Sequence, residues 1–371
     1  NGISMGASGA TGIATILNVL QTSQRHGPLR AIFTSGKNGD MSGAKNLDPS
    51  YLDGHCLIGL NGETTWTVNI SSSYALTLNT ERNLTATATQ GRYAYVIAAS
   101  GFSTGRVRAS DYASRVNPVT IVSEVLTNAK SAGVFYELCE FSGGTDALHM
   151  PGEATAVVVV NDYEKKRFLQ IFDSVEKTYR DRAEQAMIAM IETIIPPEAV
   201  SNEDADNALT FLFGLLSSDF SNGGDAAASL YINHVDLSPQ RFSCEIAVLG
   251  ADKDAAERIV KEQTNIEKLS YLPVSETDRV PGFATDPDGE AVRRMIGAYG
   301  KVLKSDCETG AGTFACELGY LHEKNPDLDI LSIGVTIDGK DTPEESIDRA
   351  TIAVPANAIL EYLNTEARET L

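Results

Sequence analysis

The stretch Leu29-Arg-Ala-Ile-Phe-Thr-Ser-Gly-Lys-Asn-Gly-Asp-Met-Ser-Gly43 decides how the rest of the chain is interpreted. Its apolar part, Ala31 to Phe33, predicts a buried strand. The polar, glycine-rich residues that follow predict a loop at the carboxyl end of that strand, where open α/β sheets bind their ligands. Yet Gly36 to Gly39 contain no carboxylate and no imidazole, and Asp40 is the nearest acid. An expected active-site loop therefore lacks the usual catalytic side chains.

Predicted helices and strands alternate on both sides of this stretch. Before and after it, apolar spacing predicts a helix within Met5–Ser23, a short helix at Asp48–Leu52 and a strand at Cys56–Leu60. Beyond Pro281 the same alternation returns. There we expect helices at Asp288–Val302 and Phe314–Lys324, a strand at Asp329–Ile337, and a last helix at Pro343–Glu366 with a break at Pro355. This order is typical of an α/β domain.

The middle of the chain has a different pattern. From Trp66 to about Leu126, Thr, Ser, Val and Tyr alternate as in antiparallel strands, and a helix is expected from about Tyr112 if Pro118 lies in its first turn. Further strands, helices and a hairpin follow up to Glu267. We therefore predict a discontinuous α/β domain, residues 1–74 and 280–371, interrupted by an inserted α+β domain, residues 75–279.

Composition restricts the classes of function. The 371 residues include 50 acids and 30 bases, a formal net charge of −20, which disfavours binding to nucleic acid or to an anionic membrane surface. No apolar run approaches the roughly 18 residues of a membrane span, and the first residues do not resemble a signal peptide. The five cysteines are scattered and never form a Cys-x-x-Cys pair. We expect a cytoplasmic protein with reduced thiols.

Several short motifs in one order resemble the Xaa-His dipeptidases, the aminoacyl-histidine or carnosinase-like family. Near the start of the chain these are Gly6-Ala-Ser-Gly-Ala-Thr-Gly, His26-Gly-Pro-Leu, Met41-Ser-Gly-Ala and Leu57-Ile-Gly-Leu-Asn-Gly-Glu. In the middle and at the end they are Gly101-Phe-Ser-Thr-Gly-Arg-Val-Arg, Met150-Pro-Gly-Glu-Ala, Pro281-Gly-Phe and Asn325-Pro-Asp-Leu-Asp-Ile-Leu-Ser-Ile-Gly. The resemblance runs through most of the chain and implies a zinc-exopeptidase-like domain, a mixed sheet flanked by helices, with an inserted lid or dimerisation domain.

The resemblance also implies which positions carry chemistry in that family, and this sequence departs from the family at each of them. Family members bind two zinc ions and activate water with a glutamate. At the metal-ligand positions this chain has Ser8, Asn38, Asn61 and Asp341, and at the general-base position it has Lys37. At the positions that stabilise the oxyanion and contact the substrate it has Arg106 and Leu148. Family members also carry an earlier segment with a His-x-Asp metal motif, which has no counterpart in these residues.

These substitutions predict that zinc-dependent hydrolysis is lost. Zinc prefers anionic or imidazole ligands, which a hydroxyl and two amides do not supply. A protonated Lys37 cannot accept a proton from metal-bound water and adds a repelling charge. We therefore expect no dipeptidase activity of this type, no catalytic residue and no metal cofactor.

Two other uses of the same region remain open. The acids Asp40, Glu63, Asp341, Glu344 and Glu345 could bind a hard cation such as calcium or magnesium, although a solvated acidic rim explains them better. Lys37 and Arg106 could instead bind a peptide carboxylate or a small acidic ligand, near Leu148 and near Glu317, which is retained from a family motif.

Three hypotheses follow. The first, which we favour, is a non-catalytic homologue that binds a ligand or has a structural role, as a homodimer formed through the inserted domain. The second is a hydrolase with a rebuilt metal site. The third is a subunit or fragment of a larger peptidase-like assembly.

Overall fold

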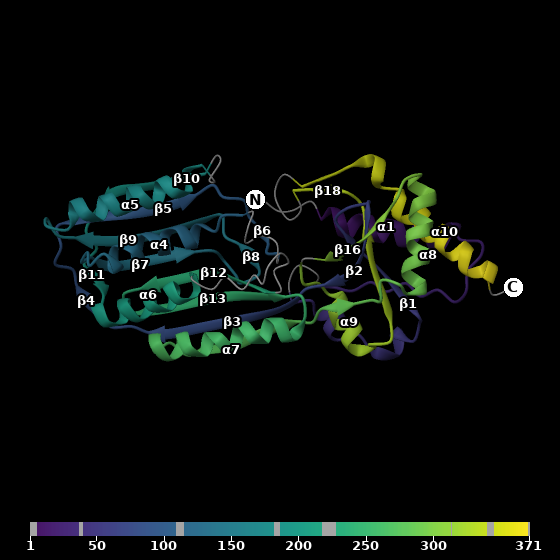
Figure 1. Cartoon of the computed structure of the whole chain (residues 1–371), viewed down its shortest axis with the longest axis horizontal. Coiled ribbons are helices and arrows are strands. Elements are labelled where there is room, and N and C mark those ends of the chain that lie inside the picture. The colour runs from purple at the N-terminus through teal and green to yellow at the C-terminus, as the bar shows by residue number, and fades with distance from the viewer. Residues whose placement is uncertain are drawn as a thin grey trace. The chain divides into compact units, whose positions relative to one another are not determined.

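A computed structural model describes residues 6–36, 40–108, 115–181, 186–216, 228–312, 314–339 and 345–369. The chain forms two compact units (Figure 1). One consists of Asn1–Tyr74 and Val280–Leu371, and is called the outer unit here. The other, Ala75–Arg279, is called the inserted unit.

The outer unit contains a five-stranded mixed sheet. Its strands follow the order β1-β17-β2-β15, and β16 also pairs with β2. β1 and β17 are parallel, and Ile58 of β1 lies opposite Leu331 of β17. The strand bounds are β1 Cys56–Gly62, β2 Thr67–Ser72, β15 Phe283–Ala284, β16 Glu308–Gly312 and β17 Asp329–Gly334.

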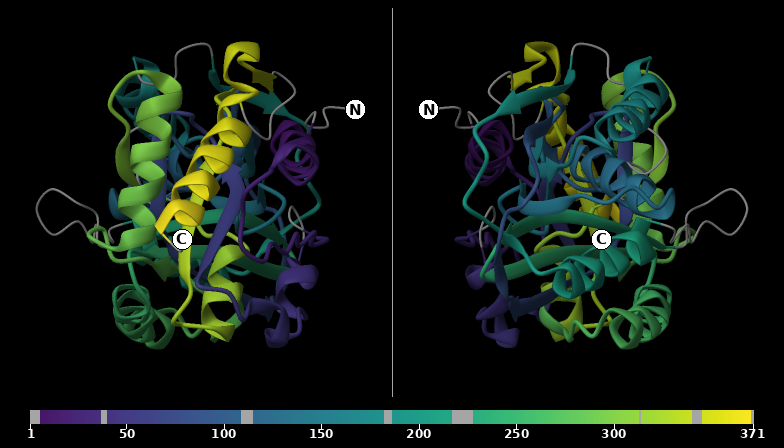
Figure 2. Two further views of the ribbon diagram at one scale, coloured as in Figure 1. Left: turned by 90° about the vertical axis from the view of Figure 1, so that its right-hand side faces the viewer. Right: turned by 90° about the vertical axis from the view of Figure 1, so that its left-hand side faces the viewer.

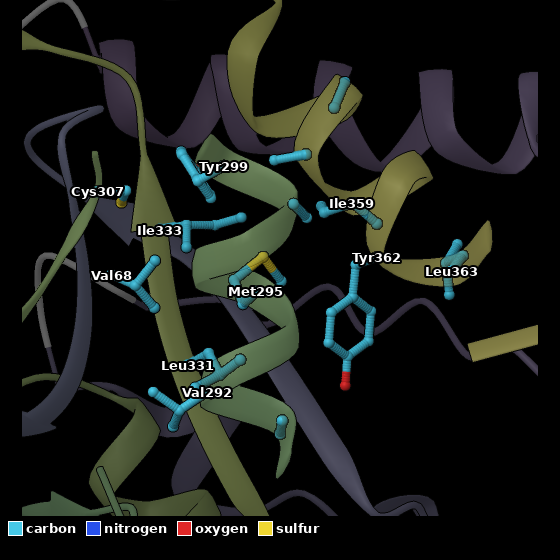
Figure 3. Close-up of a cluster of buried hydrophobic side chains, with 14 of the residues drawn as sticks. Val68, Val292, Met295, Tyr299, Cys307, Leu331, Ile333, Ile359, Tyr362 and Leu363 are labelled. Carbon is cyan, nitrogen blue, oxygen red and sulfur yellow. The ribbon is translucent and has the colours of Figure 1, made fainter. Parts of the chain in front are cut away.

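Three long helices of the outer unit lie side by side (Figure 2, left). They are α1 (Ala7–Thr22), α8 (Glu290–Leu303) and α10 (Val354–Glu369). The buried residues of α8 recur every three or four positions, from Val292 through Met295 to Tyr299, as expected for one apolar helix face. These side chains meet those of α10 and of β17 in one hydrophobic core (Figure 3).

Shorter elements complete the outer unit. Asp48 caps the 3₁₀ turn η1 because its side chain accepts a hydrogen bond from the Ser50 backbone N–H. The remaining elements are α2 Ser42–Lys45, η1 Pro49–Leu52, α9 Leu318–Lys324, β18 Ile337–Asp338, β19 Ser346–Ile347 and η2 Arg349–Thr351.

Two predicted elements of the outer unit are wrong. Ala31 to Phe33 do not form a strand but lie in irregular structure, and Phe33 is 55% exposed. An apolar triplet becomes a buried strand only where a neighbouring strand accepts its backbone hydrogen bonds, and none of the described strands pairs with it. The last helix does not start near Pro343: β19 and η2 come first, and α10 begins at Val354. Pro355 consequently lies in the first turn of α10, where the missing N–H costs nothing, rather than at a break.

The inserted unit is built on an eight-stranded sheet with the order β10-β5-β9-β7-β12-β13-β3-β14. The pairs from β10 through β5, β9, β7 and β12 to β13 are antiparallel, as in the pairing of Val96 with Val157 between β5 and β9. The strands are β3 Tyr74–Asn83, β5 Tyr93–Ser100, β7 Glu137–Gly143, β9 Glu153–Val160, β10 Met187–Thr193, β12 Ala228–Ser238, β13 Arg241–Gly250 and β14 Val274–Val280. Two further pairs are β4 Ala86–Ala88 with β11 Glu198–Val200, and β6 Gly105–Arg106 with β8 His149–Met150.

Among the described residues of this unit, four helices pack on the sheet in the spatial sequence α5, α4, α6, α7 (Figure 1). α4 begins at Pro118, which occupies its first turn as the sequence requires, and Asn117 caps it by accepting a hydrogen bond from the Val119 N–H. Asp252 caps α7 in the same way. The bounds are α4 Pro118–Ser131, α5 Lys165–Arg180, α6 Asn202–Leu216 and α7 Lys253–Ser270.

None of the described helices combines the length and the apolar character needed to cross a bilayer. All five cysteines are free thiols.

Candidate functional site

Asn61 occupies the centre of the candidate site in the outer unit. It lies near the carboxyl end of β1 and is only 3% exposed. Its carbonyl oxygen Oδ1 accepts a hydrogen bond of 2.7 Å from the hydroxyl of Ser332 on the adjacent β17. The amide nitrogen Nδ2 is buried and has no hydrogen-bond partner among the described residues. The predicted metal-ligand position therefore holds a neutral amide whose oxygen already accepts one hydrogen bond.

Cys316 lies against the same amide. Burial raises the pKa of its thiol, and the charge of the neighbouring Glu317 acts in the same direction. A thiol that stays protonated is a poor nucleophile. Cys316 is therefore a packing residue.

Glu317 adds a carboxylate to this cluster. It precedes the first residue of α9, and its Oε2 atom is buried with no hydrogen-bond partner in the described part of the chain. The hydroxyl of Ser72 is also buried and unpartnered there. Glu317, Cys316, Ser72 and Asn61 thus form a buried polar cluster with unused hydrogen-bonding capacity.

Ala7 and Glu345 meet at the start of α1, one residue before Ser8. Ser8 is 8% exposed, and the backbone N–H of Ala7 beside it donates a 2.7 Å hydrogen bond to Oε1 of Glu345. A carboxylate at this position compensates the unpaired N–H groups and the positive end of the helix dipole. Glu345 therefore stabilises the start of α1.

Those of the proposed cation ligands that the structure describes do not gather into a site. Asp40 is exposed, and the pKa of its carboxyl is lowered by the hydrogen bonds it accepts from the backbone and hydroxyl of Ser42. Glu63 and Glu345 are described, but among the described residues no three His, Cys, Asp or Glu side chains converge as metal ligands. Lys37, Asn38, Asp341 and Glu344 lie outside the described residues.

Two predicted site residues belong to the inserted unit. Arg106 ends the two-residue strand β6 and lies opposite His149 of β8. Leu148 precedes β8, and its carbonyl accepts a hydrogen bond from Val107 at 2.9 Å. Arg115 donates to the carbonyls of Arg106 and Ser103, which fixes the path of the chain around Arg106.

Sequence reasoning missed His149 and Asp146. The imidazole Nδ1 of His149 lies 2.8 Å from Oδ1 of Asp146. His149 follows Leu148 directly, so a histidine beside a substituted contact position was the available signal. Its alignment with Arg106 depends on strand register, which spacing along the chain does not show.

The described residues do not fit a zinc centre. Asn61 is neutral and bonded to Ser332, and Ser8 offers only a hydroxyl, whereas zinc requires imidazole, thiolate or carboxylate ligands. Cys316, the nearest softer ligand, is held in its protonated form.

Comparison with known proteins agrees with the resemblance. No family model matches the chain. It is 18% identical over 356 residues to the cytosol non-specific dipeptidase of Escherichia coli (strain K12), covering 93% of this chain and 73% of that protein. Its structure is similar to aminoacylhistidine dipeptidase from Vibrio alginolyticus, with a TM-score of 0.77, 18% identity and coverage of 98% of this chain and 76% of that one.

The fold is therefore a peptidase-type α/β fold, which confirms the predicted fold class. The chain is homologous to cytosol non-specific dipeptidase and has the fold of aminoacylhistidine dipeptidase.

Proposed function

We propose that this protein is a dipeptidase-fold homologue that binds a peptide or a small acidic ligand and does not hydrolyse peptide bonds through zinc. The homology supports the peptidase class. The loss of hydrolysis is supported chiefly by Asn61, whose oxygen is bonded to Ser332 at a position where the family binds metal. Without a metal, nothing at this position would lower the pKa of an attacking water.

Elemental analysis and hydrolysis assays test the proposal. The protein is purified without chelator, its zinc content is measured, and a panel of Xaa-His dipeptides is offered. The cytosol non-specific dipeptidase, purified in parallel, is the positive control. We expect substoichiometric zinc and no hydrolysis above the no-enzyme rate. One or two zinc ions per chain, with hydrolysis that a chelator abolishes, would establish the alternative, a hydrolase with a rebuilt metal site.

We also propose that two copies associate through the inserted unit. β10 is the outer strand of the eight-stranded sheet and pairs only with β5 among the described strands. It contains neither Lys nor Pro, and its register with β5 has no bulge, so Glu192 is its one charged protection as an edge strand. Met187 and Ile191 on this strand are 54% and 56% exposed.

Antiparallel pairing of β10 with its own copy about Met190 would place Glu192 opposite Ile188 and avoid contact between like charges. Light scattering at micromolar concentration tests this. We expect a dimer that Ile191→Lys converts to monomer, whereas Leu269→Lys, at a 69% exposed site in α7, leaves it dimeric. A monomeric parent protein would contradict the proposal.

A larger assembly is a second candidate, favoured by the outward face of α1. Ile13, Leu17 and Leu20 are each about half exposed on this helix, although its buried face carries the smaller side chains of Ala7, Ser8, Thr15 and Val19. An apolar stripe of this kind marks a surface that packs against another element. Mass photometry that showed only one or two copies, and no change with Leu17→Lys, would remove this candidate.

A further inference from the structure

The sheet of the outer unit ends at β1, which lacks the usual protection of an edge strand. Among the described strands, β1 pairs only with β17. Edge strands are usually protected against further pairing by charged side chains, proline or bulges. β1 has the sequence Cys-Leu-Ile-Gly-Leu-Asn-Gly, with no charge and no proline, and its register with β17 is regular from Cys56 to Gly59. This stretch is therefore suited to pair with another strand.

β14, which ends the strand order of the eight-stranded sheet, has the protection that β1 lacks. Its sequence, Val-Ser-Glu-Thr-Asp-Arg-Val, contains three charged side chains, and its residues from Ser275 to Arg279 are all exposed. Charges along an edge oppose the approach of a further strand. β1 is equally long and contains no charge. The contrast indicates that the free edge of β1 is not adapted to remain in water.

The backbone of β1 directs hydrogen-bonding groups to its free side. The N–H of Asp329 on β17 donates to the carbonyl of His55, just before β1. In a parallel ladder, alternate residues of a strand direct their N–H and C=O groups to the same neighbour. His55 and Leu57 therefore face β17, whereas Ile58 directs its N–H and C=O to the side without a described strand. An extended polypeptide matches this alternation of donors and acceptors.

α1 covers β1 and carries its exposed apolar residues to one side. A Cβ atom on Gly12 would lie 3.2 Å from the carbonyl oxygen of Leu60, so Gly12 faces β1. Each residue of a helix is turned by about 100° from the one before it. Relative to Gly12, Leu20 and Ile13 are turned by about 80° and 100° to one side, and the buried Thr15 by about 60° to the other. The exposed and the buried side chains thus lie on opposite sides of the line that faces β1.

The exposed side of α1 is the side of the free edge. α8 and α10 share one core with β2 and β17, and α1 contacts α10, so these helices lie on the side of α1 toward β17. Ile13, Leu17 and Leu20, each about half exposed, are then left for the other side. These three side chains and the free edge of β1 are called the β1 edge surface here.

The β1 edge surface is uncharged. Neither α1 nor β1 contains Asp, Glu, Lys or Arg, although the whole chain has 50 acids and 30 bases. A surface helix usually presents charged residues on its outward face. Without charge, the surface cannot attract a partner electrostatically. A partner must instead be matched by main-chain hydrogen bonds and apolar side chains.

We propose that the β1 edge surface binds an extended segment of a second polypeptide, which adds to the sheet as a strand beside β1 and places apolar side chains against α1. Strand addition gains affinity from main-chain hydrogen bonds and specificity from alternate side chains. The inference rests on the larger assembly put forward above as a second candidate and names the chemistry of the partner. It does not depend on zinc, on hydrolysis or on pairing through β10.

A synthetic peptide with the sequence of Asp329–Gly334 tests the proposal on the full chain. This sequence forms β17, so it suits a strand beside β1. Calorimetry measures its affinity, and NMR measures amide hydrogen exchange. We expect the peptide to slow exchange at Ile58 at least tenfold and to leave Leu57, which already faces β17, unchanged. If about 1 mM peptide, ten times a Kd of about 0.1 mM, has no effect at Ile58, the proposal is wrong.

A matched peptide separates strand addition from binding through side chains. It has the same sequence with methyl groups on two consecutive backbone nitrogens, one of which faces the neighbouring strand in any extended register. It keeps the side chains and loses a donor. We expect it to leave exchange at Ile58 unchanged. Equal protection by both peptides would overturn the proposal.

Two variants of α1 test the apolar stripe. Leu20→Lys introduces a charge into the β1 edge surface and should weaken binding of the unmethylated peptide about tenfold. Asn18→Lys introduces the same charge at an exposed position of the same helix, about 120° from Gly12 on the side of Thr15, and should change nothing. Equal affinities in the two variants would overturn the contact with α1.

A second copy of the chain is the competing occupant. Exchange at Ile58 is therefore measured without peptide, at protein concentrations of about 0.05 and 1 mM. We expect no difference. Protection that rises with protein concentration would show that copies of the chain pair through β1, and would overturn the proposal. These measurements use neither zinc nor substrate, so their failure is distinguishable from failure of the proposed ligand binding and loss of hydrolysis.

Discussion

At the scale of single residues, Asn61 connects β1 to β17 through the hydroxyl of Ser332. Asn61→Asp would place a carboxylate in a site that is 3% exposed and provides no cation among the described contacts. We expect the free energy of unfolding to fall by about 2–4 kcal/mol, measured by urea denaturation, because the charge is buried without a partner.

Zinc should not restore the stability of this variant. If it did, the other family metal positions would still be able to hold the ion, and the proposed loss of the metal centre would be wrong. The control is Asn357→Asp in the first turn of α10, where the residue is exposed and a negative charge is tolerated. Its effect should stay within about 0.5 kcal/mol.

The carboxylate of Asp204 should make the stability of the inserted unit depend on pH. Burial raises the pKa of its carboxyl, but hydrogen bonds from the Thr85 N–H at 2.8 Å and the Ser201 hydroxyl at 2.9 Å, with a smaller contribution from Arg82, lower it overall. A pKa that is lower in the folded state stabilises the protein above the unfolded pKa, and this contribution is lost as the pH falls through the folded value.

Asp204→Asn should therefore destabilise the protein by about 1–3 kcal/mol at pH 7, since it replaces a bonded carboxylate at a site where the residue is 8% exposed. The difference between parent and variant should shrink below about pH 4. Thermal denaturation from pH 7 to pH 3 measures it. A difference that was constant over this range would show that the charge of Asp204 has no role.

Whether a functional residue can be predicted from the sequence depends on whether a local motif or the pairing of distant strands marks it. Ser8 and Asn61 were found because each lies within a local motif, and the structure places both in buried positions of the outer unit. Asp146 and His149 were not found, because their significance arises from the β6–β8 register that brings His149 opposite Arg106. Non-local pairing of this kind has no signature in the order of residues.

At the scale of elements, α9 depends on one close contact. A Cβ atom on Gly319 would lie 1.6 Å from the carbonyl oxygen of Pro281, so the helix and the turn before β15 can only touch with glycine at this position. Gly319→Ala should cost roughly 3 kcal/mol or more of unfolding free energy, because one of the two backbone segments must move.

A glycine in α8 provides a matched control. A Cβ atom on Gly297 would meet nothing within 4 Å, so Gly297→Ala should stabilise the protein by about 0.5–1 kcal/mol through helix propensity alone. Urea denaturation of both variants measures the two effects. Destabilisation by both, or by neither, would mean that the close contact does not decide the outcome.

Elements with strong local signals were predicted well, and those that depend on partners were not. The helix within Met5–Ser23 appears as α1, and the strand at Cys56–Leu60 as β1. Ala31 to Phe33 failed because apolar character alone does not supply a pairing strand. Pro355 was misinterpreted because proline both breaks helices and begins them, and only the start of α10 at Val354 distinguishes the two.

At the scale of the whole molecule, the α/β class followed from the order of helices and strands at the two ends of the chain. That order is a property of the sequence, and the structural similarity confirms the class. The order of strands within the sheets was not predictable. β1 pairs with β17, more than 260 residues further along the chain, and such contacts depend on the packing of α8 and α10 rather than on local pattern.

The inserted unit should fold when it is separated from the rest of the chain. It begins in β3 and ends in β14, which are neighbours in the sheet. The hydroxyl of Thr277 donates to the carbonyl of Thr77, and that of Ser275 to Asn79, so the two strands run antiparallel. The same register places Ala75 opposite Arg279.

The two ends of the fragment 75–279 therefore lie close together. Excising this fragment from the chain divides no strand at its centre. We expect this fragment to give a dispersed NMR spectrum and one cooperative thermal transition, because its sheet and the described helices α4, α5, α6 and α7 are retained. A shorter fragment, 75–252, loses α7 and β14 and leaves β13 without the helix that packs on it, so it should not unfold cooperatively. If fragment 75–279 showed no transition while the full chain did, the stability of the inserted unit would have to come from the outer unit, and the boundary at β3 and β14 would not separate independent cores.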